Sequence, residues 1–368
     1  MRDEEFMKIA LQLAKNGQGN TSPNPMVGAV IVKNGEIIGQ GWHEEYGKPH
    51  AERNALAACT INPQDATMYV TLEPCCHHGK QPPCVDAIIG AGIKRVVIGS
   101  ADPNPLVSGK GIRILKEHGI EVIQDVLKAD CDRLNEIFFH YIKNKTPFVT
   151  MKYAMTMDGK IATATGASKW ITSKAARLHV HQQRHRHKAI MVGVGTVLAD
   201  DPLLTCRIDG GRNPIRIICD SRLRTPLTAQ VVTTARQFST ILVTTCDDEI
   251  QKAPYEERGC QILTVNSLDH HVNLQQLMKR LGQMQIDSIL LEGGGTLNWS
   301  ALESGIVQKL HTYIAPKIFG GHLSPSPVGG LGVRIPSTAF LLQNSSVTQL
   351  GEDFLIESEV KPNVYRNY

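Results

Sequence analysis

The stretch from His50 to Cys84 constrains this chain more than any other part of the sequence. It contains, in order, the segments His50-Ala51-Glu52, Pro74-Cys75 and Pro82-Pro83-Cys84. One imidazole and two thiolates can hold a tetrahedral Zn²⁺ at three corners and leave the fourth corner open for water. A zinc ion of this kind lowers the pKa of its bound water toward neutrality. The chain is therefore expected to fold so that His50, Cys75 and Cys84 converge on one Zn²⁺, with the Glu52 carboxylate beside them to move protons.

The order His-x-Glu, Pro-Cys and Cys is typical of zinc-dependent deaminases of cytosine- and adenine-type rings. The usual second half is Pro-Cys-x-x-Cys, whereas here eight residues separate Cys75 from Cys84. The longer loop changes a pocket wall but not the ligand set, although Cys76, His77 and His78 are rival ligands within it. A closed structural zinc site is the main alternative, but it needs a fourth protein ligand and leaves the nearby carboxylate without a task. Metal-free buried thiols agree less well with the prolines that stiffen the backbone beside both cysteines. We therefore interpret the stretch as a catalytic zinc site.

Length and composition predict a globular chain of two domains. A chain of 368 residues exceeds one ordinary core, and 42% hydrophobic with 20% charged residues is typical of globular proteins. The net charge of +4 is small for this length and gives no case for a nucleic-acid or membrane partner. No apolar run approaches the roughly 18 residues of a membrane span, and the first residues lack the apolar core of a signal peptide. Nine cysteines without regular spacing favour a reducing, cytoplasmic location.

The first part of the chain alternates between strand and helix patterns. Apolar residues at helical spacing predict a first helix from Phe6 to Ala14, and Asn34-Gly35 predicts a hairpin between two strands. The remaining segments are a helix over 50–58, strands over 68–72 and 95–98, and helices over 84–91, 111–119 and 131–141. Such alternation is typical of an α/β domain in which helices cover a layered sheet.

A polar, proline-closed joint over 143–147 marks the expected domain boundary. We place the first domain at 1–145 and the second at 146–368. The second domain restarts with a strand over 148–154, and further strands are expected over 189–194, 215–219, 241–244 and 288–291. A helix bearing Arg177, His181, Arg184 and His185 lies between the first two of these strands.

Three features of the second domain indicate anion binding, each with an ordinary alternative. The run Gly293-Gly294-Gly295-Thr296 follows a strand and can bring backbone N–H groups close to a phosphate, but it is neither a Rossmann fingerprint nor a P-loop. Arg184 and Arg207 could each grip a phosphate, or be solvated surface charges. The histidines at 179, 181, 185 and 187 have a metal-like spacing, but we favour a polar helix face.

Both halves of the chain resemble the bifunctional riboflavin-biosynthesis deaminase–reductase family. The first half does so in the segments Pro23-Asn24-Pro25-x-Val27-Gly28, His50-Ala51-Glu52, Thr71-Leu72-Glu73-Pro74-Cys75, Pro82-Pro83-Cys84 and Asp102-Pro103-Asn104-Pro105. The second half does so in Lys152 to Lys160, Trp170-Ile171-Thr172-Ser173, Asp200-Asp201-Pro202 to Arg207, Glu292-Gly293-Gly294 and Ala315-Pro316-Lys317. The resemblance implies an α/β chain with a cytidine-deaminase-like three-layer domain in front and a dihydrofolate-reductase-like domain behind.

The resemblance also implies two consecutive reactions on one small phosphoribosyl pyrimidine. The first is hydrolytic deamination of 2,5-diamino-6-(5-phosphoribosylamino)pyrimidin-4-one, with zinc on His50, Cys75 and Cys84, Glu52 as the proton carrier and Asn24 against the substrate. The second is NADPH-dependent reduction of the ribosyl group to ribityl. The implied NADPH-binding residues are Ala154, Trp170, Thr196, Asp200, Ser221, Gly294, Gly295 and Thr296. The implied substrate-binding residues are Ser168, Arg184, Leu203, Arg207 and Glu292.

Further expectations stand beside this resemblance. Arg222, next to Ser221, could meet the 2′-phosphate of NADPH and favour it over NADH, which is our own hypothesis. The family usually has serine where this chain has Cys76, and an apolar or small residue where it has Arg53. The resemblance suggests a homo-oligomer. The rival functions are a nucleoside or tRNA deaminase with an appended domain, for which basic and aromatic stripes are lacking, and a zinc-stabilised nucleotide sensor, which would not need Glu52.

Overall fold

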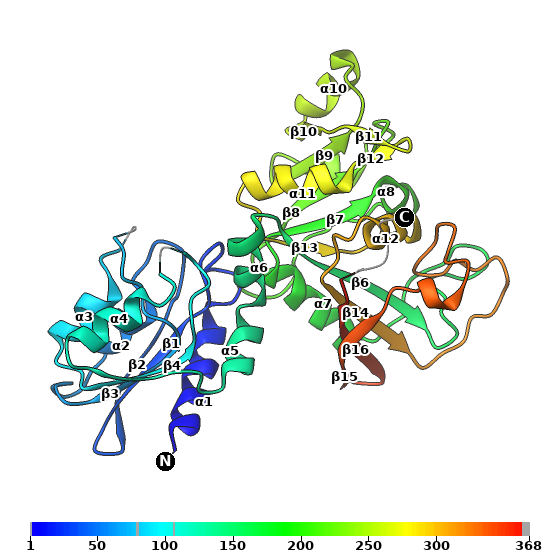
Figure 1. Ribbon diagram of the computed structural model, residues 1–368. Coiled ribbons are helices and arrows are strands. Elements are labelled where there is room, and N and C mark those ends of the chain that lie inside the picture. Colours follow the sequence, from blue (N-terminus) through cyan, green and yellow to red (C-terminus); the bar gives the residue numbers. More distant parts are fainter. Residues whose placement is uncertain (1, 79–80, 106, 363–368) are drawn as a thin grey trace. The chain divides into compact units, whose positions relative to one another are not determined.

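The computed structural model describes residues 2–78, 81–105 and 107–362 (Figure 1). The chain divides into two compact units, Met1–Lys145 and Thr146–Tyr368. Each unit has its own sheet and its own apolar clusters. Among the residues described, no helix combines the length and the apolar character that crossing a membrane requires.

The first unit is built on a five-stranded sheet in the order β2-β1-β3-β4-β5. Strands β1 and β2 form an antiparallel hairpin closed by Asn34 and Gly35, whose φ angles of 54° and 83° suit the hairpin turn that their sequence predicts. Strand β3 pairs antiparallel to β1, and β4 and β5 continue parallel to β3. The strands are β1 Gly28–Lys33, β2 Glu36–Trp42, β3 Thr67–Leu72, β4 Arg95–Ser100 and β5 Glu121–Ile123.

Helices cover both faces of this sheet. Successive side chains of a strand point to opposite faces, and in β1 Ala29 and Ile31 join one apolar cluster while Val30 and Val32 join another. The first cluster includes residues of α2, α3 and α4, and the second includes residues of α1 and α5, so these helices lie on opposite sides of the sheet (Figure 1). This is the expected three-layer arrangement. The helices are α1 Asp3–Ala14, η1 Lys15–Gly17, α2 Ala51–Ala57, α3 Cys84–Gly90, α4 Lys110–Glu117, α5 Lys128–Leu134 and α6 Glu136–Asn144.

Helix α2 packs unusually close to strand β2. A Cβ atom added at Gly41 would lie 2.3 Å from the backbone nitrogen of Ala55 and 2.7 Å from the carbonyl oxygen of Ala51. A Cβ atom at Gly39 would lie 2.4 Å from the carbonyl oxygen of Ala55. The two glycines therefore determine how near α2 approaches the sheet.

The prediction of a single helix over 131–141 is wrong in detail, because two helices occupy this stretch. Helix α5 ends at Leu134 and α6 begins at Glu136, with Asn135 between them. The buried Asn135 side chain accepts from the Met26 backbone N–H and donates to the Met26 carbonyl, both at 2.9 Å. The side chain thus bonds a distant backbone segment at the point where the helix breaks.

The second unit is built on a nine-stranded sheet in the order β10-β9-β8-β7-β13-β6-β14-β16-β15. The first seven strands of this order, from β10 at one edge to β14, run parallel to one another. Strands β16 and β15 add an antiparallel hairpin at the other edge. The strands are β6 Phe148–Thr156, β7 Ala189–Gly193, β8 Ile215–Cys219, β9 Thr240–Thr244, β10 Gln261–Thr264, β13 Ser288–Leu291, β14 Lys309–Ala315, β15 Leu342–Leu350 and β16 Asp353–Val360. The short strands β11 Ser267–Leu268 and β12 His271–Val272 form a separate hairpin.

Helices also cover both faces of the second sheet. Residues of α11 and α12 join one apolar cluster with Ala189 and Met191 of β7, and residues of α8, α9 and α10 join another with Ile190 and Val192. Ligands of parallel α/β sheets bind beyond the carboxyl ends of the strands. The ends of β7, β8 and β13 therefore point to the functional region. The helices are α7 Lys174–Arg186, α8 Val194–Asp200, α9 Gln230–Thr233, α10 Glu249–Glu256, α11 Leu274–Gln283, α12 Gly295–Glu303 and η2 Pro336–Thr338.

Candidate active sites in the two units

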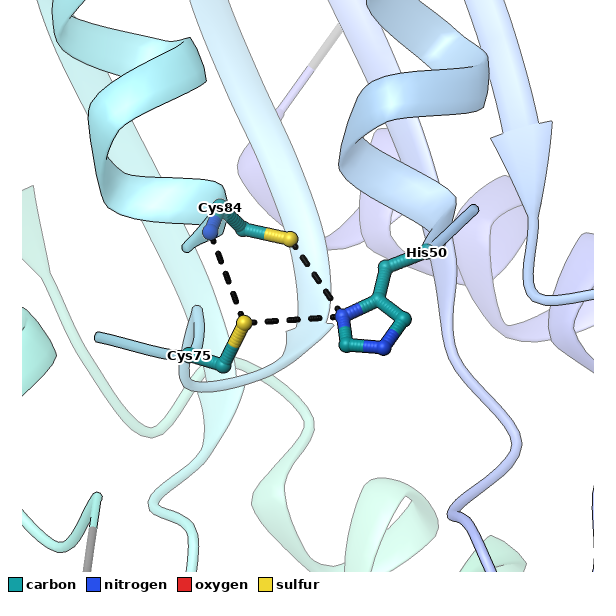
Figure 2. Close-up of side chains that lie close together, drawn as sticks. All are labelled: His50, Cys75 and Cys84. Atoms are coloured by element: carbon teal, nitrogen blue, oxygen red, sulfur yellow. Dashed lines mark hydrogen bonds between the residues drawn. The ribbon is translucent and has the colours of Figure 1, made fainter. Parts of the chain in front are cut away.

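Three metal-ligating side chains converge in the first unit. His50 Nδ1 and the Sγ atoms of Cys75 and Cys84 all lie within 4.8 Å of one another. The distances from His50 Nδ1 are 3.5 Å to Cys75 Sγ and 3.4 Å to Cys84 Sγ (Figure 2). Bond lengths of about 2.0 Å to nitrogen and 2.3 Å to sulfur in a tetrahedral zinc site separate the two ligand atoms by about 3.5 Å. The donor set and its spacing therefore fit Zn²⁺.

Each ligand stands at the end of a regular element. His50 is the N-cap residue of α2, Cys75 follows β3, and Cys84 is the first residue of α3. The Cys84 backbone N–H donates to Cys75 Sγ at 3.4 Å, which ties the start of α3 to the strand end (Figure 2). A hydrogen bond with Cys84 is the main reason why the pKa of the Cys75 thiol falls to about 4. Burial opposes this shift, and a hydrogen bond with His50 adds to it. A thiolate is the form that binds metal.

Glu52 lies on the first turn of α2 and is only 3% exposed. Burial is the main reason why the pKa of Glu52 rises to about 7. The residue lines a cavity of about 310 Å³ together with His50 and Cys75. The size of the cavity suits a small ring rather than a polymer. A carboxyl group that can hold or release a proton near neutral pH is thus at the wall of a small-molecule pocket.

Asn24 lines the same cavity, and the structure adds neighbours that the sequence did not single out. His43 Nε2 lies 3.3 Å from Asn24 Nδ2, and the His43 ring centroid is 5.2 Å from that of His50. Asp102 and Asn104 also line the cavity. They follow β4, which runs parallel to β3, so the two strands end at the same edge of the sheet. This shared edge was the signal that could have linked the Asp102-Pro103-Asn104 segment to Cys75.

One of the rival ligands, Cys76, has other surroundings, whereas another, His77, reaches the same cavity as His50 and Cys75. Cys76 packs against the apolar cluster on the α2 side of the sheet. The metal-ligating group found among the described residues does not include it. His77 lines the cavity, and its Nδ1 atom is buried.

The second unit contains a larger cavity of about 800 Å³ at the carboxyl ends of its parallel strands. Its lining includes seven of the residues implied by the resemblance, together with Arg222. These seven are Ser168, Thr196, Asp200, Ser221, Gly294, Gly295 and Thr296. Ser168 Oγ donates to Asp200 Oδ1 at 3.2 Å, which joins an implied substrate residue to an implied cofactor residue.

The glycine run forms the turn from β13 into α12. Gly293 has a φ of 94°, which favours glycine, and the Gly294 backbone N–H donates to Thr196 Oγ1 at 3.0 Å. A Cβ atom at Gly295 would lie 3.2 Å from the backbone of both Ser326 and Gly329. The turn is thus closely packed, and the nine-residue helix α12 starts at the cavity wall.

Arg184 and Glu292 form a buried ion pair beyond the end of β13. Arg184 Nε donates to Glu292 Oε1 at 2.7 Å and Nη2 donates to Oε2 at 3.0 Å. Lys152 Nζ, for which the sequence pattern gives no role, lies 3.5 Å from the same carboxylate. Burial raises the pKa of Glu292, but the charges of Arg184 and Lys152 have the larger combined effect and bring it down to about 2. Glu292 is therefore an anion held between two cations.

Six implied residues are not among the described residues that line the large cavity: Arg184 and Glu292 of the ion pair, and Ala154, Trp170, Leu203 and Arg207. Ala154 packs beside the cluster of Ala176, Tyr313 and Leu355. Trp170 is 62% exposed, and the Arg177 guanidinium lies 4.6 Å from its ring centroid. The remaining two make backbone contacts: the Leu203 carbonyl accepts from Arg216 Nη1 at 3.2 Å, and the Arg207 N–H donates to His181 Nδ1 at 3.3 Å.

Family comparisons match both units. The cytidine and deoxycytidylate deaminase zinc-binding region matches residues 1–100, and the RibD C-terminal domain matches residues 147–356. The riboflavin biosynthesis protein RibD of Actinobacillus pleuropneumoniae is 53% identical over 357 residues, which cover 97% of this chain and 95% of that protein. The RibD protein of Aquifex aeolicus is 45% identical, covering 96% of this chain and 97% of its own length.

Solved structures agree with these relatives. Acinetobacter baumannii RibD superposes with a TM-score of 0.86 at 35% identity, covering 98% of this chain and 99% of that one. A Thermotoga maritima diaminohydroxyphosphoribosylaminopyrimidine deaminase/5-amino-6-(5-phosphoribosylamino)uracil reductase superposes with a TM-score of 0.84 at 38% identity and the same coverage. These matches confirm the expected fold of both units, and they exclude a lone nucleoside or tRNA deaminase and a nucleotide sensor. The chain therefore belongs to the RibD family, the bifunctional deaminase–reductases of riboflavin biosynthesis.

Proposed function

We propose that the first unit deaminates 2,5-diamino-6-(5-phosphoribosylamino)pyrimidin-4-one at the site formed by His50, Cys75, Cys84 and Glu52. The convergence of one imidazole and two thiolates beside a buried carboxyl group is the observation that carries this proposal. Zn²⁺ bound there would supply Lewis-acid activation of water at neutral pH. Its two cysteine ligands need to be reduced thiolates, which fits a reducing, cytoplasmic location.

The residues of the chain would supply proton transfer and orientation. The Glu52 carboxylate takes one proton from the attacking water and passes it to the ring nitrogen, and it then carries the second water proton, from the new hydroxyl group, to the amino group, which leaves as ammonia. Asn24, next to His43, faces the cavity with amide groups that can hydrogen-bond the polar edge of a pyrimidine. Water replaces the 2-amino group, so the products are the ring carbonyl and ammonia.

Replacement of Glu52 by glutamine tests the first step. Ammonia release is expected to fall by about 10²–10⁴-fold, because glutamine keeps the size of the side chain but cannot accept the proton. Bound zinc, measured by elemental analysis, should remain near one per chain, and reduction by the second unit should continue. Glu45→Gln is the matched control, since the Glu45 side chain is 56% exposed. Ammonia release by Glu52→Gln at the rate of the control would refute the assignment.

We further propose that the second unit uses NADPH to reduce the ribosyl group to ribityl. The support is a cavity of about 800 Å³ with a glycine turn and a helix N-terminus on its wall, which suits a dinucleotide phosphate. NADPH, when bound, supplies hydride, and the open, imine form of the sugar accepts it at C1 with one proton from the medium. The proposed substrate contacts are Ser168 at the cavity wall, the Arg184–Glu292 pair, the loop at Leu203 and the exposed Arg207. The side chains of Ala154 and Trp170, outside the cavity lining, are the least supported of the proposed cofactor contacts.

Arg222 lines this cavity and remains our candidate for the 2′-phosphate of NADPH. Arg222→Ala should raise the NADPH Michaelis constant about tenfold or more, because a charge-assisted contact contributes about 1.5–3 kcal/mol. The NADH constant should barely change. Arg258→Ala is the matched control, because the Arg258 guanidinium donates to the Pro254 carbonyl, four residues earlier in the chain. Equal effects on NADPH and NADH would count against the role of Arg222.

We also propose that the chain forms a homo-oligomer through strand β15. The sheet order ends at β15, and the exposed apolar residues of this strand include Leu342 at 43% and Val347 at 65%. An exposed edge strand is a template for pairing with another chain. Light scattering should give a multiple of the monomer mass, and Val347→Lys should lower it. A monomeric mass for the unmodified chain would contradict this proposal.

A further inference from the structure

Three histidines on α7 and His187, the C-cap residue of this helix, form two pairs that face different parts of the second unit. His179 Nδ1 lies 2.8 Å from the Tyr313 hydroxyl of β14, and the buried His187 Nε2 lies 2.9 Å from the Thr150 hydroxyl of β6. These two rings therefore face the sheet rather than solvent. The sequence-based interpretation as one polar helix face is wrong for this pair.

The other pair, His181 and His185, faces the loop after α8. The backbone N–H of Arg207 donates to His181 Nδ1 at 3.3 Å, and the backbone N–H of Arg212 donates to His185 Nδ1 at 3.0 Å. A backbone amide can only donate, so each Nδ1 must carry a free lone pair and each ring proton must be on Nε2. Both histidines thus act as neutral acceptors for the loop.

Further bonds from α7 reach the same loop. Arg184 Nη1 donates to the Thr205 carbonyl at 2.9 Å, and Cys206 Sγ lies 3.3 Å from the His181 carbonyl. Arg212 Nη2 donates to the carbonyls of His185 at 3.3 Å and His187 at 3.0 Å. The segment 205–213 is therefore attached to α7 at several positions along the helix.

Neutral acceptors suit this place because the surroundings are cationic. Burial, and then the charges of Arg184 and Arg207, lower the pKa of His181 to about 4. A lysine or arginine side chain could not accept a hydrogen bond from the backbone amide. A carboxylate could accept it, but would neutralise the positive charge that attracts a phosphate. A neutral imidazole accepts the hydrogen bond and leaves the charge of the two arginines unchanged.

We propose that His181 and His185 are positioning residues that hold segment 205–213 on α7 and so place Arg207 against the phosphate of the reductase substrate. The inference rests on the proposed function of Arg207. Arg184 extends from the same helix to Glu292, so the attachment also sets the position of Arg207 relative to the buried ion pair. The histidine spacing, which resembles a metal site in the sequence, is on this view a loop attachment.

Two substitutions at one position provide the test. Asparagine places an oxygen acceptor where His181 Nδ1 lies, whereas leucine has a similar size and no acceptor. In the full-length enzyme with saturating NADPH, His181→Leu should raise KM for 5-amino-6-(5-phosphoribosylamino)uracil about tenfold, because the segment that carries Arg207 loses this hydrogen bond to α7. The kcat value should change less than about twofold. His181→Asn should remain within about threefold of the unmodified KM.

Readouts independent of substrate separate positioning from a general loss of structure. Hydrogen exchange at the Arg207 amide should be faster in His181→Leu and near normal in His181→Asn. Nitrogen-15 spectra should assign the Nε2–H tautomer to His181 in the unmodified enzyme. Ammonia release and the NADPH KM should stay unchanged. His322→Leu, at an exposed histidine of the same unit, is the control. If His181→Leu does not fold, His181→Gln replaces it, because its longer side chain moves the acceptor away from the amide.

Three results would overturn the inference. One is unchanged KM and unchanged Arg207 amide exchange in His181→Leu, and another is equal damage by leucine and asparagine. The third is a Nδ1–H tautomer for His181. Arg207→Ala separates this inference from the proposed function on which it rests. If Arg207→Ala leaves KM unchanged, the proposed role of Arg207 fails and the inference with it. If Arg207→Ala raises KM while His181→Leu does not, only the inference fails.

Discussion

Replacing Glu292 by glutamine should strongly destabilise the second unit. Glu292 accepts two hydrogen bonds from Arg184 and lies 3.5 Å from Lys152. The side chains are 8%, 12% and 15% exposed for Glu292, Arg184 and Lys152, so solvent screens these charges little. Glutamine removes the only negative charge of the group and leaves two cations facing each other.

The size of the loss follows from the pKa of Glu292. Burial raises this pKa, the charges of Arg184 and Lys152 lower it, and the result is a fall from the ordinary 4.5 to about 2. Each tenfold change in an acid constant corresponds to about 1.4 kcal/mol, so the folded state favours the carboxylate by roughly 3 kcal/mol. Breaking a buried ion pair by removing one partner costs about 3–5 kcal/mol, which agrees. We therefore expect a loss of roughly 3 kcal/mol in the free energy of unfolding at pH 7.

The same pair gives a pH dependence of definite sign. A carboxyl group with a lowered pKa in the folded state contributes stability at all pH values above its unfolded pKa, near 4.5. That contribution is lost as the pH falls from about 4.5 to about 2. The stability difference between the unmodified chain and Glu292→Gln should therefore be constant near neutrality and shrink over this acid range.

Urea unfolding followed by tryptophan fluorescence measures the effect on one unit. The chain has three tryptophans, and Trp42→Phe leaves only Trp170 and Trp299, both in the second unit. A double-mutant cycle with Arg184→Gln should give a coupling energy of about 3 kcal/mol. Glu303→Gln, at an exposed glutamate of α12, is the control and should change stability by less than about 0.5 kcal/mol. A loss below about 1 kcal/mol for Glu292→Gln, or a coupling energy near zero, would refute the reasoning.

Three other outcomes are expected. Chelation of zinc should abolish ammonia release and leave NADPH oxidation intact. Added Zn²⁺ should restore ammonia release in the same sample, and loss of both activities on chelation would contradict this prediction. Arg216→Met should destabilise the second unit by about 3 kcal/mol or more in the same urea assay, because the fully buried Arg216 side chain donates to the carbonyls of Leu203, Val231 and Phe238, and all three of these hydrogen bonds would be lost. Asn135→Leu should destabilise the first unit by about 2–3 kcal/mol, measured by the fluorescence of Trp42, through the two bonds to the Met26 backbone; an unchanged urea midpoint would contradict this.

Local patterns carry much of the fold. The strand expected over 215–219 is β8 Ile215–Cys219, and the one over 288–291 is β13 Ser288–Leu291, because buried parallel strands are short and mostly apolar, even though β8 includes the buried Arg216. Strand β15 has no such pattern. Its residues from Leu342 to Leu350 are mostly polar and exposed, since it pairs with β16 on one side at the edge of the sheet. An edge strand buries little, and hydrophobic periodicity therefore gives little sign of it.

The two sites differ in how far spacing alone could describe them. His50, Cys75 and Cys84 belong to rare residue types with a shared chemistry, so their grouping could be expected from the sequence. His43 and Asp102 reach the same cavity from other strands. Only the order and register of the sheet bring them there: His43 has no local pattern, and the segment Asp102-Pro103-Asn104-Pro105 does not by itself indicate this cavity. Lys152 has no role in the sequence pattern, and only the pairing of β6 with β13 brings it beside Glu292.

The absence of two side chains on β2 has a consequence for mutational studies of this enzyme. His50 and Glu52 are separated by less than one turn of α2, and they must move together if that helix is lifted. A methyl group at Gly41 would collide with the α2 backbone at 2.3 Å. A substitution at Gly41, which is neither a zinc ligand nor a proton carrier, would therefore shift both His50 and Glu52 at once. Screens for loss of ammonia production should therefore recover small, chemically inert replacements at position 41 as readily as changes to the reactive groups themselves.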